Sequence, residues 1–283
     1  MAPSIGLIVT GKDALRDFHI FVQTLEMWHK DATLFVYTDS ETDVKSVPYK
    51  GTIQTKEAMN QYVGKRRYEM ESLPGIKYDS LFKDYTYEKA NVLEWMLETL
   101  GSEQIQTEGI WFMDADIAHL APLPTIPATA TLALSPHFIR ECDTKKYGYY
   151  NAGYLWLNNP KFLPIWVEAG FQSRFFEQAA LEKIAEVAKQ ENTLYEFPDQ
   201  VNFGWWRMFQ SPKNPVRIQE AFSIFRKEQS VGIRYEGKAL QSVHTHWNNQ
   251  GEQALIVFNT WLRELLKKIP SHAPCQRFRS IVG

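Results

Sequence analysis

The chain has 283 residues, of which 44% are hydrophobic and 23% are charged, and its formal net charge is −2. These proportions are typical of a folded globular protein, so they exclude extensive disorder and argue against a membrane-spanning chain. The near-neutral charge and the lack of a basic stripe interleaved with aromatics also argue against nucleic-acid binding.

The two cysteines, Cys142 and Cys275, are too few for a disulfide framework and do not have the spacing of metal ligands. Free thiols are typical of a reducing compartment. Residues 1–4 lead directly into an apolar run, without a charged n-region or an apolar stretch of about 18 residues. We therefore expect a cytoplasmic protein without a transmembrane segment.

The first 40 residues have the pattern of a β-α-β unit. Residues 5–9 form a short apolar run that predicts a strand, and residues 33–37 form a second one that ends at Asp39. Thr10-Gly11-Lys12 is the turn that follows the first strand. Helical spacing then connects the apolar residues Leu15, Phe18, Val22 and Leu25.

Residues 43–84 are less regular, and their basic cluster Lys65-Arg66-Arg67 is either a solvated surface or a contact for phosphate or substrate. Residues 87–100 then predict a helix. Lys89 falls in its first turn, where a cation opposes the helix dipole. An anion at the sheet edge would resolve that conflict, or the lysine stem packs while its ammonium reaches water.

The most informative stretch is the apolar run 110–113, which is followed by Asp114-Ala115-Asp116. It predicts a buried parallel strand with both carboxylates at its carboxyl end, on the same sheet edge as Asp39, and open α/β sheets bind ligands there. Mg²⁺ and Mn²⁺ prefer a few carboxylates plus substrate phosphates, so the pair indicates a metal site for a nucleotide diphosphate. The triplet alone would also suit an acidic turn or a helix cap, but the proline-containing loop 117–124 favours a strand exit.

Two further strands are predicted at residues 131–135 and 149–157. Within the second segment, Asn151-Ala152-Gly153 places a small, hydrogen-bonding stretch just before the apolar part. Backbone can approach a ligand closely at such a stretch, although a plain turn is the competing explanation. No internal repeat and no linker rich in Gly, Ser or Pro divides the chain.

The C-terminal part of the chain contains two further polar motifs. Asp199-Gln200 precedes Trp205-Trp206, and residues 243–247 are strand-like with His244 and His246 on one face. Helices are predicted at residues 162–190, in two pieces, and at residues 252–269.

The order of these features resembles the GT-A glycosyltransferases, most closely the retaining group around glycogenin and the bacterial lipopolysaccharide galactosyltransferases. The likeness extends over nearly the whole chain. Its most specific elements are Trp111-Phe112-Met113-Asp114-Ala115-Asp116, Asn151-Ala152-Gly153, Asp199-Gln200 and His244. The resemblance implies a Rossmann-like α/β fold with a mixed, mainly parallel central sheet flanked by helices. It also implies one domain over residues 1–283, with a nucleotide-binding half to about residue 120 and an acceptor-binding half, including the C-terminal helix, from about 121.

The resemblance implies a metal ion as well. Mn²⁺, or Mg²⁺, would join the diphosphate of a nucleotide sugar to Asp114, Asp116 and a late histidine. Both His244 and His246 are candidates for that histidine, and His244 is preferred because it follows the hydrophobic residue Val243 as the family's histidine does.

Roles for other residues follow from the same resemblance. Lys89 matches the family's basic residue and would stabilise the charge on the leaving diphosphate. Asp199 would contact sugar hydroxyls or take the acceptor proton, and Gln200 would lie near the anomeric centre. The remaining residues expected to bind the nucleotide are Val9, Thr10, Gly11, Tyr37, Asp39, Ala115 and Asn151. Two departures from the family pattern are Asn202, one residue nearer than the usual asparagine, and residues 247–251, which replace the usual Lys-Pro-Trp.

The sequence therefore predicts a metal-dependent glycosyltransferase that moves a sugar from a UDP- or GDP-linked donor to a carbohydrate acceptor. Aromatic residues expected to meet that acceptor are Tyr150, Trp205, Trp206 and Trp247. One alternative is a sugar-1-phosphate nucleotidyltransferase, which would want a Gly-rich loop where residues 10–13 offer a single glycine. The other is a non-catalytic carbohydrate-binding homologue, in which Asp114 and Asp116 only cap backbone amides.

Overall fold

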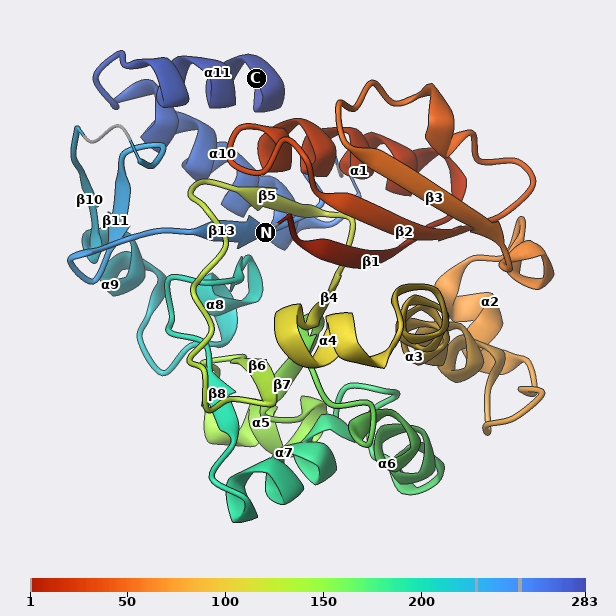
Figure 1. Cartoon of the computed structure of the whole chain (residues 1–283). Helices are drawn as coiled ribbons and strands as arrows, with labels where there is room; N and C mark the ends of the chain where they lie inside the picture. The colour runs from red at the N-terminus through yellow and green to blue at the C-terminus, as the bar shows by residue number, and fades with distance from the viewer. Residues whose placement is uncertain (1, 227–228, 249–250) are drawn as a thin grey trace.

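The computed structural model describes residues 2–226, 229–248 and 251–283, and Figure 1 shows the arrangement of its elements. Asn249 and Gln250, within the segment that departs from the family pattern, lie outside the described residues. In the described part, seven strands form a central sheet in the order β3-β2-β1-β4-β7-β6-β8. They are β1 (Ser4–Val9), β2 (Thr33–Thr38), β3 (Thr52–Glu57), β4 (Ile110–Met113), β6 (Leu132–Pro136), β7 (Tyr150–Leu157) and β8 (Leu194–Glu196).

This sheet is mixed and mainly parallel, as predicted. β1 pairs in parallel with β2 and β4, β2 with β3, and β6 with β8, whereas β7 runs antiparallel to both β4 and β6. All four residues of β4 are buried and apolar, because helices cover both faces of the sheet. Strands from the N-terminal and C-terminal halves of the chain share this one sheet.

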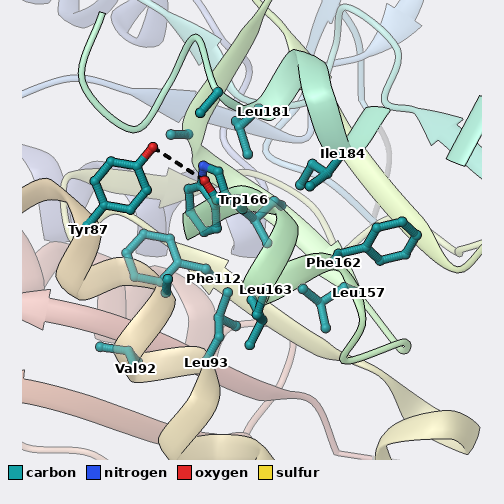
Figure 2. Close-up of a cluster of buried hydrophobic side chains, with 14 of the residues drawn as sticks. Tyr87, Val92, Leu93, Phe112, Leu157, Phe162, Leu163, Trp166, Leu181 and Ile184 are labelled. Carbon is teal, nitrogen blue, oxygen red and sulfur yellow. Dashed lines mark hydrogen bonds between the residues drawn. The ribbon is translucent and has the colours of Figure 1, made fainter. Parts of the chain in front are cut away.

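One face of the sheet is covered by α3 (Leu81–Leu100), α6 (Phe162–Ala169) and α7 (Leu181–Gln190), with α2 (Arg67–Ser72) and α4 (Ser102–Glu108) beside α3. Figure 2 shows side chains of these helices converging in one apolar cluster, among them Val92, Leu93, Leu163, Trp166, Leu181 and Ile184. Burying a side chain of this size stabilises the fold by about 1.5–3 kcal/mol. The cluster therefore holds α3 rigidly against β1 and β4, which lead to the sheet edge where ligands are expected.

The opposite face is covered by α1 (Gly11–Glu26), whose apolar stripe Phe18, Phe21, Val22 and Leu25 packs on the sheet. Next to it lies a small sheet of β5 (Ile117–His119), β13 (Ser242–His244) and β9 (Phe203–Gly204). In that sheet His244 pairs with Ile117, directly after the Asp-x-Asp triplet. The pairing brings the late histidine back to the end of β4.

The remaining elements form the periphery. They are α5 (Glu141–Tyr147), α8 (Trp206–Gln210), α9 (Pro215–Glu220), β10 (Phe222–Ile224), β11 (Ile233–Tyr235), β12 (Lys238–Ala239), α10 (Gln253–Lys267), α11 (Ala273–Val282) and 3₁₀ turns at Val44–Ser46, Asn60–Tyr62 and Gly170–Gln172. α10 and α11, blue in Figure 1, share an apolar cluster with the small sheet, and α11 contacts α1. Among the described residues, no helix combines the length and the apolar character needed to cross a bilayer. Cys142 and Cys275 are free thiols, and the cytoplasmic location stays a prediction.

Three sequence predictions need correction. α3 begins at Leu81, after a cap in which Ser80 Oγ accepts the Lys83 amide, rather than at residue 87. The aromatic-rich first turns disguise the helical period, but packing against the sheet overrides that weak local signal. β3 lies within residues 43–84, where the sequence predicts no strand, because it is a polar edge strand. Asn151-Ala152-Gly153 lies inside β7 rather than before it.

Candidate active site

The two aspartates of the Asp-x-Asp triplet and the late histidine meet at the carboxyl end of β4. His244 Nε2 lies 3.0 Å from Asp116 Oδ1 and 3.8 Å from Asp114 Oδ2. One potential ligand atom from each of these residues lies within 4.8 Å of the other two. Three ligands predicted from distant parts of the sequence therefore surround one point.

These residues line a cavity of about 450 Å³, a size suited to a substrate. Its walls are formed by the first half of α1, by residues 82–89 of α3, by residues 175–178 and by the segment after β13. A wider groove of about 760 Å³ lies between α6 and α7, but none of the described residues that line it belongs to the metal-ligand cluster. The smaller cavity is thus the candidate active site.

A chain of hydrogen bonds fixes the orientation of His244. The Asn151 Oδ1 atom accepts the Gly153 amide, so the Asn202 atom that faces it must be the Nδ2 donor. The Asn202 Oδ1 acceptor therefore faces His244 Nδ1, at 2.9 Å, and that nitrogen carries a proton. His244 Nε2 is then turned toward Asp114 and Asp116. This donor set fits Mn²⁺ or Mg²⁺: two carboxylates and one imidazole, with the imidazole held from behind as in known metal sites.

The close packing around Gly153 explains why the Asn-Ala-Gly motif ends in glycine. A Cβ atom at this position would lie 2.2 Å from Asp114 Oδ2 and 2.6 Å from His244 Cε1. Any larger residue would therefore displace two of the three candidate ligands. Asn151 is buried, and its contacts with Gly153 and Asn202 give it a positioning role behind the ligands rather than a place on the cavity wall.

The charge of Asp116 is stabilised by the imidazoles around it. Burial would raise the pKa of Asp116, but His244 and His246 outweigh that effect and hold it below its ordinary value. His246 Nε2 lies 3.5 Å from Asp116 Oδ2. The Asp116 carboxylate in turn raises the pKa of His246 to about 10, although burial opposes the shift. Asp116 is thus kept in the ionised form that binds a cation.

Lys89 joins the site from the middle of α3, and not from a first helical turn as predicted. Its Nζ lies 3.0 Å from Asp114 Oδ1 and 3.0 Å from Glu177 Oε1. Burial would lower the pKa of Lys89, but the Asp114 and Glu177 carboxylates raise it above its ordinary value. The cation is therefore balanced by two carboxylates and has no conflict with the helix dipole.

Only some of the residues expected to bind the nucleotide lie at the cavity. Ala115 and Lys89 line it. Val9 and Tyr37 are instead buried in the core, where the Tyr37 hydroxyl donates to the Asn91 carbonyl. Thr10 bonds the Tyr85 hydroxyl at the cavity rim. The Asp39 carboxylate accepts backbone amides at Gly11 and Glu41, beside a neighbouring cavity of about 350 Å³. Its oxygens hold the turns after β1 and β2 together.

The acid–glutamine pair chosen from the sequence is not the pair in the cavity. Gln200 is buried and donates to the Tyr235 carbonyl, and Asp199 borders a separate cavity of about 350 Å³. Glu177 and Gln178 line the candidate active-site cavity instead. Glu177 contacts Lys89, and the Gln178 Oε1 atom accepts a hydrogen bond from Asn151. The signal that would have found them is the same acid–glutamine dipeptide, here just before α7.

The aromatic residues expected to meet an acceptor also need correction. Tyr150, Trp206 and Trp247 are buried side chains of the core. Trp205 lines the cavity, and so do Phe175 and Phe176, which no motif in the sequence indicates. Tyr150 begins β7, Trp206 begins α8 and Trp247 follows β13, and all three fill the core, which is the ordinary role of aromatics.

Neither a protein-family model nor a curated protein matches this sequence. Solved structures do match it. The galactosyltransferase LgtC, in complex with donor and acceptor sugar analogues, has a TM-score of 0.50 at 11% identity, and the match covers 98% of this chain and 99% of LgtC. The bifunctional glycosyltransferase WbbM, in its apo form, has a TM-score of 0.52 at 10% identity, covering 95% of this chain and 52% of WbbM. Mouse xyloside xylosyltransferase 1 scores 0.45 at 9% identity, covering 73% of this chain and 90% of that one. The order of strands and helices thus gives this chain the GT-A glycosyltransferase fold that its sequence motifs resemble.

Proposed function

We propose that this protein is a metal-dependent glycosyltransferase, which moves a sugar from a nucleotide-diphosphate donor, UDP- or GDP-linked, to a carbohydrate acceptor. The observation that carries the proposal is the convergence of Asp114, Asp116 and His244 within 4.8 Å of one another at the carboxyl end of a central strand. That edge is where open α/β sheets bind ligands. The fold shared with LgtC and WbbM supports the same conclusion.

The donor's diphosphate would lie beside the cluster. Mn²⁺ or Mg²⁺, held by Asp114, Asp116 and His244, would supply Lewis-acid stabilisation of the leaving nucleoside diphosphate. Lys89 adds a positive charge 3.0 Å from Asp114, on the same side of the cavity. A fixed cation near the point where charge develops stabilises the transition state without reorganisation.

The acceptor and the transferred sugar would lie against the part of the cavity wall that Trp205 and residues 175–178 form, next to the cluster. Flat aromatic rings suit the apolar face of a sugar. Gln178 lines this wall, where Asn151 and the Tyr147 carbonyl orient its amide, and we assign its remaining N–H to the sugar, while Glu177 balances Lys89. In this proposal residues 1–120 bind mainly the nucleotide and residues 121–283 bind mainly the acceptor.

A nucleotidyltransferase is disfavoured by the turn after β1. Such an enzyme needs free backbone amides in a Gly-rich loop to cradle the phosphates of its substrate. Here the Gly11 amide already donates to Asp39 and Thr42, and the loop contains no second glycine. The remaining rival is a carbohydrate-binding homologue without catalysis.

A screen of nucleotide sugars with Mn²⁺, scored by nucleoside diphosphate release, tests the proposal. We expect release with at least one donor, its loss in EDTA, and a reduction of about 10²–10³-fold in Asp116→Asn. Asp13→Asn is the matched control, since Asp13 is exposed on α1. Melting curves of both variants check that each is folded at the assay temperature, since Asp116→Asn also loses the contacts of a buried carboxylate with two imidazoles. No release with any donor, together with UDP binding that EDTA leaves unchanged, would favour the non-catalytic rival.

A further inference from the structure

A second histidine and a buried aspartate lie behind the metal-ligand cluster. Asp17, in the middle of α1, is 4% exposed, although its neighbours on that helix face are apolar core residues. Its Oδ2 atom lies 2.7 Å from His246 Nδ1, and the backbone of Trp247 also hydrogen-bonds the carboxylate. A buried carboxylate is costly unless it is paired. Packing alone would therefore not explain a carboxylate at position 17.

The other side of the His246 ring faces the cluster. His246 Nε2 lies 3.5 Å from Asp116 Oδ2, the carboxylate oxygen that His244 does not contact. The backbone takes part as well, because the Thr245 amide donates to the Asp116 carbonyl at 3.1 Å. Three consecutive residues, 244–246, thus hold Asp116 by its two carboxylate oxygens and its carbonyl.

The loop that carries His246 is itself anchored. Thr245 Oγ1 donates to Asn259 Oδ1, and Asn259 Nδ2 donates to the His246 carbonyl. Asn259 is buried in α10. α10 thus holds the backbone of His246 and α1 holds its ring, and together they orient the ring toward Asp116.

We propose that Asp17 and His246 form a positioning pair for Asp116, which holds Oδ2 so that Oδ1 stays turned toward His244 and the metal position. The inference rests on the metal site of the proposed function. His246 itself stands outside the set of ligand atoms that surround one point, which comprises Asp114, Asp116 and His244 among the described residues. Its contact is with the far oxygen of Asp116, so it acts through that carboxylate. Outer partners of this kind typically change metal affinity by about 10–100-fold.

Mn²⁺ affinity, measured by the electron paramagnetic resonance signal of free Mn²⁺, tests the pair without any turnover. We expect His246→Leu and Asp17→Asn each to weaken binding by about 10–100-fold. His246→Gln places an N–H donor near the position of Nε2, so it should recover most of the Mn²⁺ affinity. Asp13→Asn, one turn earlier on α1 and exposed, should bind as the wild type does. Melting temperatures in EDTA, compared across the variants, show that each protein is folded.

The outcomes separate this inference from the proposed function. Wild-type Mn²⁺ affinity in folded His246→Leu and Asp17→Asn, with binding lost in Asp116→Asn, would overturn the positioning pair and leave the metal site intact. A loss in His246→Gln as deep as in His246→Leu would also overturn it, in favour of an imidazole bound to the metal itself. An absence of Mn²⁺ binding by the wild type would instead remove the metal half of the proposed function, and this inference with it.

Discussion

The ammonium of Lys89 supplies a buried positive charge in the candidate active site, and removing it tests the charge balance there. Nζ lies 3.0 Å from Asp114 and 3.0 Å from Glu177, and the Lys89 and Glu177 side chains are only 12% and 7% exposed. At an effective dielectric constant of about 20, one such contact is worth roughly 5 kcal/mol before desolvation is subtracted. Since removing one member of a buried ion pair costs about 3–5 kcal/mol net, we expect Lys89→Met to lower the free energy of unfolding by about that amount.

Urea unfolding in EDTA near neutral pH, followed by circular dichroism, measures this change. The matched control is Lys183→Met on α7, because its exposed ion pair with Glu186 is worth less than about 1 kcal/mol. The double variant Lys89→Met/Glu177→Gln removes the more buried of the two carboxylates that lose their partner, so it should recover part of the loss. A Lys89→Met protein within about 1 kcal/mol of the wild type would refute the reasoning, because it would mean that solvent already screens this cluster.

Two further predictions concern buried histidines and the acid–glutamine pair. Burial lowers the pKa of His119 to about 3 and that of His137 to about 4, from 6.5. The unfolded chain therefore binds protons first as the pH falls below 6.5, and stability is lost toward pH 4 by about 1.4 kcal/mol per pH unit and residue. Urea unfolding across this range should show a shallower slope in His119→Phe, and an equal slope would contradict the assignment. In the donor assay, Gln178→Ala should reduce nucleoside diphosphate release by up to about 10²-fold while Asp199→Asn changes it little, and the reverse order would restore the original choice of Asp199.

The fold and the centre of the site follow from local sequence patterns. Residues 110–113 are four consecutive apolar residues, which suit a strand covered on both faces, and the aspartates come directly after them. Parallel strands bring their carboxyl ends to one edge, so Asp39 and Asp114 were correctly predicted on the same side of the sheet. The identity of His244 as the third member of the cluster came from the family resemblance.

Other members of the site could not be read from local patterns. The start of α3 was misplaced because its aromatic first turns lack a clear period, and the position of Lys89 within the helix was therefore wrong. Two acid–glutamine dipeptides occur, at residues 177–178 and 199–200, and nothing in either segment says which one faces the cavity. Packing of α7 and of the loop before α8 decides it.

The α/β architecture and the carboxylate pair at the strand end are predictable from local sequence, because both depend on residues that are neighbours along the chain. Which distant groups support that pair depends on how the chain folds. Asp17 and His246 are 229 residues apart, and their contact exists because α1 and the segment after β13 pack against the same edge of the sheet. Hydrogen bonds and ion pairs act over about 3 Å, so the partners of a buried charge become visible only once the chain is folded.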